Sequence, residues 1–94
     1  SEQTALGRIL EAECKEGLPY QCANNLAFGD AWNTGTGNPE LMTCAAWGRS
    51  LDGVQLATTI EIPYANIGDT TVTADGARAF GRNLARAVRK YLEQ

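Results

Sequence analysis

The side chain best placed for chemistry is a carboxylate near the end of an alternating apolar segment. Residues 54–62 read Val-Gln-Leu-Ala-Thr-Thr-Ile-Glu-Ile, and strict alternation of this kind predicts a β-strand. On such a strand, Glu61 shares a face with Gln55, Ala57 and Thr59. A carboxylate beside small or polar neighbours acts as a general base where a metal or apolar surroundings tune it. The alternative is that Glu61 is a solvent-facing residue at the end of a sheet.

Two polar turns beside tryptophans are the other candidates for a pocket. They read Trp32-Asn33-Thr34-Gly35 and Trp47-Gly48-Arg49-Ser50. In a pocket, Arg49 would bind a substrate carboxylate. The alternative is ordinary loop packing, in which the tryptophans are anchors and Arg49 is exposed. The run Thr34-Gly35-Thr36-Gly37 lacks the lysine and the glycine spacing of a phosphate-binding loop, so it is not assigned that role.

Composition excludes several classes of site. The chain has 94 residues, a net charge of −3, three cysteines and no histidine. Without histidine it cannot by itself build a Ser-His-Asp triad, a Cys-His pair or a zinc site with an imidazole ligand. Three cysteines also cannot supply a four-cysteine zinc site. No metal ligand is therefore predicted within this chain.

The charge is divided unevenly along the chain. Residues 74–94 carry five basic and two acidic side chains, whereas the first 73 residues carry three basic and nine acidic ones. The basic end is either a nucleic-acid footprint or a solvated helix face that complements the negative helix terminus. The acidic overall balance favours the solvated face, so we predict no nucleic-acid partner. No apolar run is long enough for a membrane span, so no membrane is predicted. The irregular cysteine spacing leaves the compartment open.

Two helices and one strand dominate the predicted architecture. Apolar spacing predicts a helix over 3–16, ended by Gly17 and Pro19, and a second helix over 73–92 with Thr73 as N-cap. The apolar stripe predicted for the second helix consists of Ala77, Phe80, Leu84, Val88, Tyr91 and Leu92.

The rest of the chain is rich in loop-forming residues. Residues 20–53 are predicted to be mostly irregular, with a short strand at 25–31. Gly76 and Gly81 inside the second helix indicate a close approach to a sheet or another helix. We therefore expect an α/β fold in which two main helices pack on a small mixed sheet, with 54–62 as its core strand.

The stretch from Leu56 to Leu92 resembles the C-terminal end of the zinc carboxypeptidase family, in particular its bacterial branch. In that family the last strand of the sheet carries a Thr-x-Glu motif and a long helix closes the domain. Thr59-Ile60-Glu61 matches the motif, and the helix predicted over 73–92 follows it. Tyr20, the stretch 28–33 and Trp47-Gly48 match the family more loosely, in the same order.

The resemblance implies a role for two residues. Glu61 matches the glutamate that activates a zinc-bound water and passes its proton to the leaving amine, and Thr59 matches a residue that faces the substrate pocket. The family's zinc ligands, a His-x-x-Glu pair and a later histidine, have no counterpart here. Its mobile tyrosine has none either, since Tyr20 and Tyr64 do not match by position.

The expected function is thus that of a partial domain. Residues 1–94 are interpreted as one C-terminal portion of a metallocarboxypeptidase-like hydrolase, inactive alone, whose full-length parent holds zinc and acts on peptides. A related zinc deacylase acting on acyl-amino acids is one alternative. The other is a non-enzymatic interaction module. Self-association through an exposed sheet edge is expected in either case, because a partial domain leaves strands uncovered.

Overall fold

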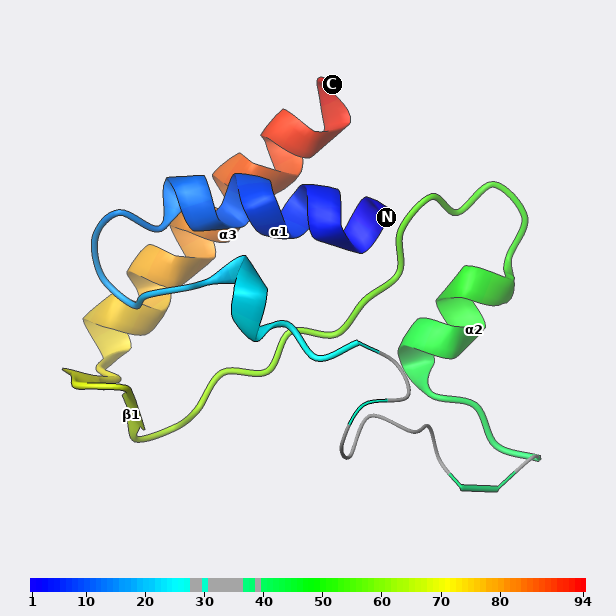
Figure 1. Cartoon of the computed structure of the whole chain (residues 1–94), viewed down its shortest axis with the longest axis horizontal. Helices are drawn as coiled ribbons and strands as arrows, with labels where there is room; N and C mark the ends of the chain where they lie inside the picture. Colours follow the sequence, from blue (N-terminus) through cyan, green and yellow to red (C-terminus); the bar gives the residue numbers. More distant parts are fainter. Residues whose placement is uncertain (28–29, 31–36, 39) are drawn as a thin grey trace.

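The computed structural model describes residues 1–27, 30, 37–38 and 40–94. Figure 1 shows helix α1 crossing helix α3, with helix α2 standing apart from both. In chain order the elements are α1 (Glu2–Glu13), a 3₁₀ turn η1 (Cys22–Asn24), α2 (Cys44–Ser50), β1 (Asn66–Ile67), β2 (Thr70–Thr71) and α3 (Ala74–Leu92). The predicted mixture of helices and sheet is confirmed at this coarse level. The sheet differs from the prediction, because it has two antiparallel strands and is not mixed.

Helix α1 begins at a capped terminus and ends earlier than the sequence pattern predicts. The Ser1 hydroxyl accepts a hydrogen bond from the Thr4 amide at 3.2 Å, which satisfies one of the free amides of the first turn. The last helical residue is Glu13, and the Cys14 amide donates to the Leu10 carbonyl. Gly17 has a φ of 79° and turns the chain three residues beyond the helix cap.

Helix α3 has the predicted start and a buried face that differs from the predicted one. The Thr73 hydroxyl accepts from the Gly76 amide at 3.0 Å, which confirms Thr73 as N-cap. The buried residues of the helix are Phe80, Asn83, Ala87 and Tyr91. Phe80 and Tyr91 of the predicted stripe are buried and Leu84 is half-buried. Ala77, Val88 and Leu92 are exposed, so the predicted stripe is wrong at these three positions. The buried face is narrow because a single helix, α1, and the turn that holds Leu18 form the core with it.

One small core joins these two helices. Its buried apolar residues are Leu6 and Leu10 of α1, Leu18 of the following turn, and Phe80, Ala87 and Tyr91 of α3. Leu18 lies against the first turn of α3, where a Cβ added to Gly76 would be 3.2 Å from its Cδ2 atom. The close approach predicted for Gly76 is therefore found, but the neighbour is the turn after α1 and not the predicted sheet or helix. The one predicted for Gly81 is wrong, since nothing lies within 4 Å of its Cβ position.

A two-stranded hairpin leads into α3. Asn66 pairs with Thr71 and Ile67 pairs with Thr70 in antiparallel register. The Val72 amide extends the ladder by donating to the Ala65 carbonyl at 2.8 Å. Ile67 and Val72 pack against the core and place the N-cap of α3 next to it.

The strand predicted over 54–62 is not formed, and this prediction is wrong for the isolated chain. The segment has no helical or strand hydrogen-bond pattern, and no described strand lies alongside it. A strand needs a neighbour that exchanges backbone hydrogen bonds with it. Val54, Ile60 and Ile62 are consequently 41%, 40% and 46% exposed.

The predictions for residues 20–53 also need correction. Residues 44–50 form helix α2. This helix was not predicted, because the range 20–53 is rich in loop-forming residues. Residues 25–27 form no strand, and residues 28–29 and 31 of the strand predicted there lie outside the described residues. The pattern failed here because α2 has only seven residues, too few for a clear helical period.

Two glycine substitutions test the packing of α1. Gly7→Ala adds a Cβ that would lie 2.7 Å from the Cys22 Sγ and 3.0 Å from the Tyr20 hydroxyl. Overpacking of this kind costs about 1–3 kcal/mol, so we expect net destabilisation despite the better helix propensity of alanine. Urea unfolding followed by circular dichroism measures the change.

Gly81→Ala is the matched control, because its Cβ meets nothing. It should stabilise the chain by about 1 kcal/mol. Equal shifts in the two variants would contradict the packing described for α1.

Candidate functional site

The segment that carries Thr59 and Glu61 is hydrogen-bonded to helices α1 and α2 at one residue, Ala57. The Ala57 carbonyl accepts two hydrogen bonds, from Gln3 Nε2 of α1 and from Arg49 Nη1 of α2, each at 3.2 Å. The preceding residue, Leu56, packs against the core. Ala57 is thereby the point at which α1, α2 and the segment meet.

Helix α2 lies close to the segment because of a glycine. A Cβ added to Gly48 would be only 2.9 Å from the Cβ of Ala57. The helix starts at Thr43, whose hydroxyl accepts from the Ala46 amide at 3.1 Å. Trp47 to Ser50 were predicted to form a polar turn, and this is wrong since they lie in α2.

A pocket lies between α2 and the segment. Its volume is about 470 Å³, and it is lined by Cys44, Ala45, Trp47, Gly48, Ala57, Thr58, Thr59 and Ile60. The lining is largely apolar and includes one predicted site residue, Thr59. It offers room for a small side chain beside an indole ring, which is suited to apolar contacts.

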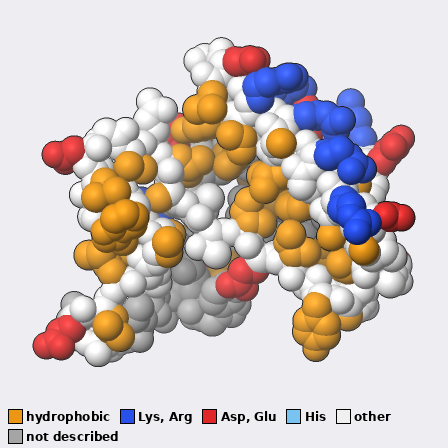
Figure 2. All heavy atoms as spheres, turned by 180° about the vertical axis from the view of Figure 1, so that it is seen from behind, with side chains coloured by type: hydrophobic (Ala, Val, Ile, Leu, Met, Phe, Trp, Pro, Cys, Tyr) orange, Lys and Arg blue, Asp and Glu red, His pale blue; other side chains and the backbone are white. Residues whose placement is uncertain are grey.

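Large apolar side chains around α2 are exposed to solvent. They include Leu41, Met42, Trp47 and Leu51. Figure 2 shows hydrophobic atoms on the α2 side of the molecule and also beside the row of basic side chains on the other side. Where exposed apolar side chains form one patch, they mark an interaction surface in many proteins.

The structure brings Arg49 of α2 next to the segment that carries Thr59 and Glu61. Thr59 lines the pocket and Arg49 donates to Ala57, two residues before Thr59. Glu61 is exposed and lies outside the pocket lining. Within the part of the chain that the structure describes, its carboxylate has no hydrogen bond or ion pair. The Arg49 guanidinium donates to the backbone carbonyl of Ala57. That Arg49 binds a substrate carboxylate stays a prediction.

The remaining candidates are not part of this arrangement. The turn at 32–35 lies outside the described residues. Tyr64 is almost fully exposed, and Tyr20 donates a hydrogen bond to the Asn25 side chain next to α1. Burial raises the pKa of the Tyr20 hydroxyl above its ordinary value, with the bond to Asn25 acting in the opposite direction. Tyr20 therefore has a structural role.

The described residues of this chain do not fit a zinc ion. Among residues 1–27, 30, 37–38 and 40–94, no group of three His, Cys, Asp or Glu side chains is arranged to hold a metal, and the sequence has no histidine. In the same described residues, no helix combines the length and the apolar character that crossing a membrane requires.

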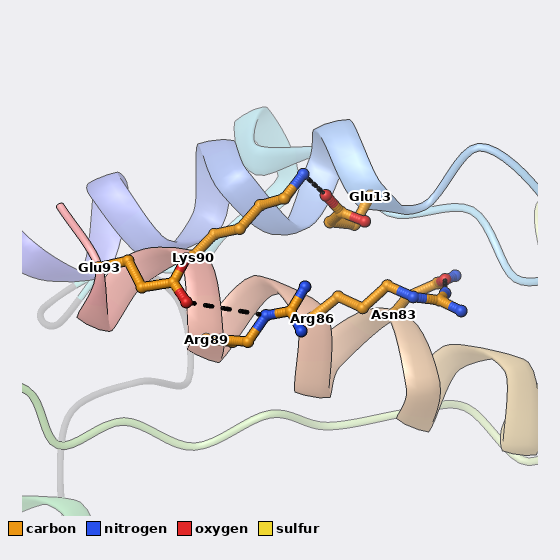
Figure 3. A network of polar contacts seen from close by, with 6 residues as sticks. All are labelled: Glu13, Asn83, Arg86, Arg89, Lys90 and Glu93. Atoms are coloured by element: carbon orange, nitrogen blue, oxygen red, sulfur yellow. Dashed lines mark hydrogen bonds and ion pairs between the residues drawn. The ribbon is translucent and has the colours of Figure 1, made fainter.

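Polar links between α1 and α3 were not predicted from the sequence. Lys90 of α3 donates to the Glu13 carboxylate, and Tyr91 donates to the carboxylate of Glu2. Figure 3 shows Lys90 reaching Glu13 across the two helices, beside the Arg89–Glu93 pair of α3. The bond to Lys90 lowers the pKa of Glu13, and the bond to Glu2 raises the pKa of Tyr91.

Asn83 is a buried polar residue that the sequence pattern also missed. Its side chain donates to the Glu16 carbonyl at 3.4 Å and accepts from Arg86 at 3.2 Å. Its position three residues after Phe80 and four before Ala87 places it on the buried face. This spacing is the sequence signal from which the burial of Asn83 could have been predicted.

Comparison of this chain with protein-family models, curated proteins and solved structures found no match.

The Glu13–Lys90 link predicts a dependence of stability on pH. The pKa of Glu13 is lower in the folded chain than its ordinary value of 4.5. Its contribution to stability is therefore present above that value and is lost as the pH falls through the lower, folded pKa. Glu13→Gln should lower the midpoint of thermal unfolding by a few degrees at pH 7 and leave it unchanged near pH 2.

The control for this prediction is Glu11→Gln, an exposed substitution on the same helix. It should leave both midpoints unchanged. A Glu13→Gln effect of the same size at the two pH values would contradict the link.

Proposed function

We propose that this chain is the C-terminal portion of a zinc carboxypeptidase-like hydrolase domain. In this proposal Glu61 is the general base and Thr59 faces the substrate. The observation that carries it is the uncovered state of residues 58–62, which hold the Thr-x-Glu motif and precede a long, well-capped helix.

An alternating apolar segment without a sheet indicates that its neighbours belong to further chain. Residues 58–62 are exposed, although Ile60 and Ile62 are residue types that gain free energy from burial on a sheet. The core formed by α1 and α3 does not reach them, since only Leu56 of the segment packs against it. Strands that flank 54–62 on a larger sheet would cover these side chains.

The same covering would change the chemistry of Glu61. A carboxylate in water is a weak base, and removal of water from around it strengthens it. Beneath neighbouring strands, Glu61 would accept a proton from the attacking water and return it to the leaving amine. Residues outside this chain would hold the zinc ion, since the described residues of this chain do not fit one.

The exposed apolar surface favours a second candidate, a self-associating interaction module. Leu41, Met42, Trp47 and Leu51 are exposed around α2. Ile60 continues this surface across the pocket. Such a module would use the same uncovered segment for pairing with another chain.

The hydrolase proposal is tested on the protein read from the natural start of its coding sequence. With zinc added, that protein should release the last residue of a benzoyl-glycyl-amino-acid peptide, or the acyl group if it is a deacylase. Glu61→Gln should lower kcat by about 10²–10⁴-fold, the usual contribution of a general base, with little change in KM. The 94-residue chain alone should release nothing.

Glu40→Gln is the matched control, because Glu40 is an exposed carboxylate outside the pocket. It should retain full activity. Full activity of Glu61→Gln, or zinc-dependent hydrolysis by the 94-residue chain, would overturn the proposal.

A further inference from the structure

We propose that two copies of this chain pair through residues 54–62 as antiparallel strands, with Thr58 opposite Thr58. The result is a dimer with two-fold symmetry. This inference rests on the second candidate function, self-association, and is independent of the hydrolase proposal.

One edge of the segment is blocked near its centre at Ala57, whereas among the described residues the other edge is open to a partner at its centre. In an extended strand, the N–H and C=O groups of successive residues point to opposite edges. The edge that carries the Ala57 carbonyl is occupied by Gln3 and Arg49. The other edge carries the backbone groups of residues 54, 56, 58, 60 and 62. Among the described residues its one hydrogen bond is a long contact of 3.5 Å from the Val54 amide to the Leu51 carbonyl.

The large apolar residues of the segment are placed symmetrically about Thr58. Antiparallel pairing with Thr58 opposite itself places Val54 opposite Ile62 and Leu56 opposite Ile60. Apolar side chains then meet apolar side chains on one face, which is the favourable arrangement for cross-strand pairs. Because the hydrogen-bonded pairs in this register are those of the even-numbered residues, it uses the open edge.

Charge also favours this register. On the opposite face, Glu61 lies across from Gln55, whose amide can donate to the carboxylate. Sliding the strands until Glu61 faces Glu61 would set two like charges directly opposite and bring Pro63 into the ladder. The occupant that fits the open edge is therefore a second copy, in one register.

Two proline substitutions distinguish the edges. In the dimer each Thr58 amide donates to the Thr58 carbonyl of the other copy, so Thr58→Pro removes two bonds. The Thr59 amide points to the other edge. Thr59→Pro is therefore the matched control, because it restricts the backbone to the same extent without removing a bond between the two copies. Sedimentation velocity over a concentration series should show a dimer for the natural chain and for Thr59→Pro. Thr58→Pro should weaken dimerisation by roughly tenfold or more.

Helical circular dichroism establishes that both variants keep α1 and α3. A monomer at every concentration of the natural chain would overturn the proposal, as would equal weakening by the two prolines.

Disulfide trapping tests the register without proline. In a chain with Cys14, Cys22 and Cys44 replaced by alanine, Thr58→Cys places two thiols directly opposite each other. Thr59→Cys places them two residues out of register, about 8 Å apart between Cα atoms, beyond the usual span of a disulfide. Mild oxidation should cross-link the first variant and leave the second monomeric on a denaturing gel. Cross-linking of Thr59→Cys at an equal rate would overturn the register.

Discussion

The packing of α1 against α3 is the contact on which the rest of this structure depends. Leu6 and Leu10 meet Phe80, Ala87 and Tyr91, and Leu18 closes one end of the contact. A chain of this size buries a limited fraction of its surface, so a core of two helices leaves a small margin of stability. Tyr91 and Lys90 also donate hydrogen bonds to side chains of α1, and these bonds restrict how the two helices can be oriented on their apolar contact.

The segment 54–62, which this core leaves largely uncovered, is common to both candidate functions. The segment 54–62 contacts the core at Leu56 and is held at Ala57, and beyond these residues it is exposed. The same exposure leaves Glu61 in contact with solvent and leaves one backbone edge free to pair. Completion of a sheet, by further chain or by a second copy, would change both properties together.

The sequence predicted the elements that local interactions determine. Thr73 caps α3 with its own hydroxyl, and the apolar spacing of α1 is satisfied within a few turns, so both helices were predictable. The absence of a strand over 54–62 could not be predicted from the local sequence, because a strand forms only with a partner strand. Asn83 and Gln3 were missed for a related reason, since their hydrogen bonds join residues distant in the sequence. Of the predicted site residues, Thr59 lines the pocket and Arg49 of α2 donates to the nearby Ala57 carbonyl, whereas Glu61 lies outside the pocket lining.

The central claim is that residues 54–62 form a strand only when another strand covers them. Hydrogen exchange of the individual backbone amides in the 94-residue chain tests it most directly, in dilute and in concentrated solution. The account predicts rapid exchange throughout the segment when the chain is dilute, and slower exchange at Leu56, Thr58 and Ile60 when it is concentrated. Protection of these amides in the dilute chain, or its absence in the concentrated one, would contradict the account.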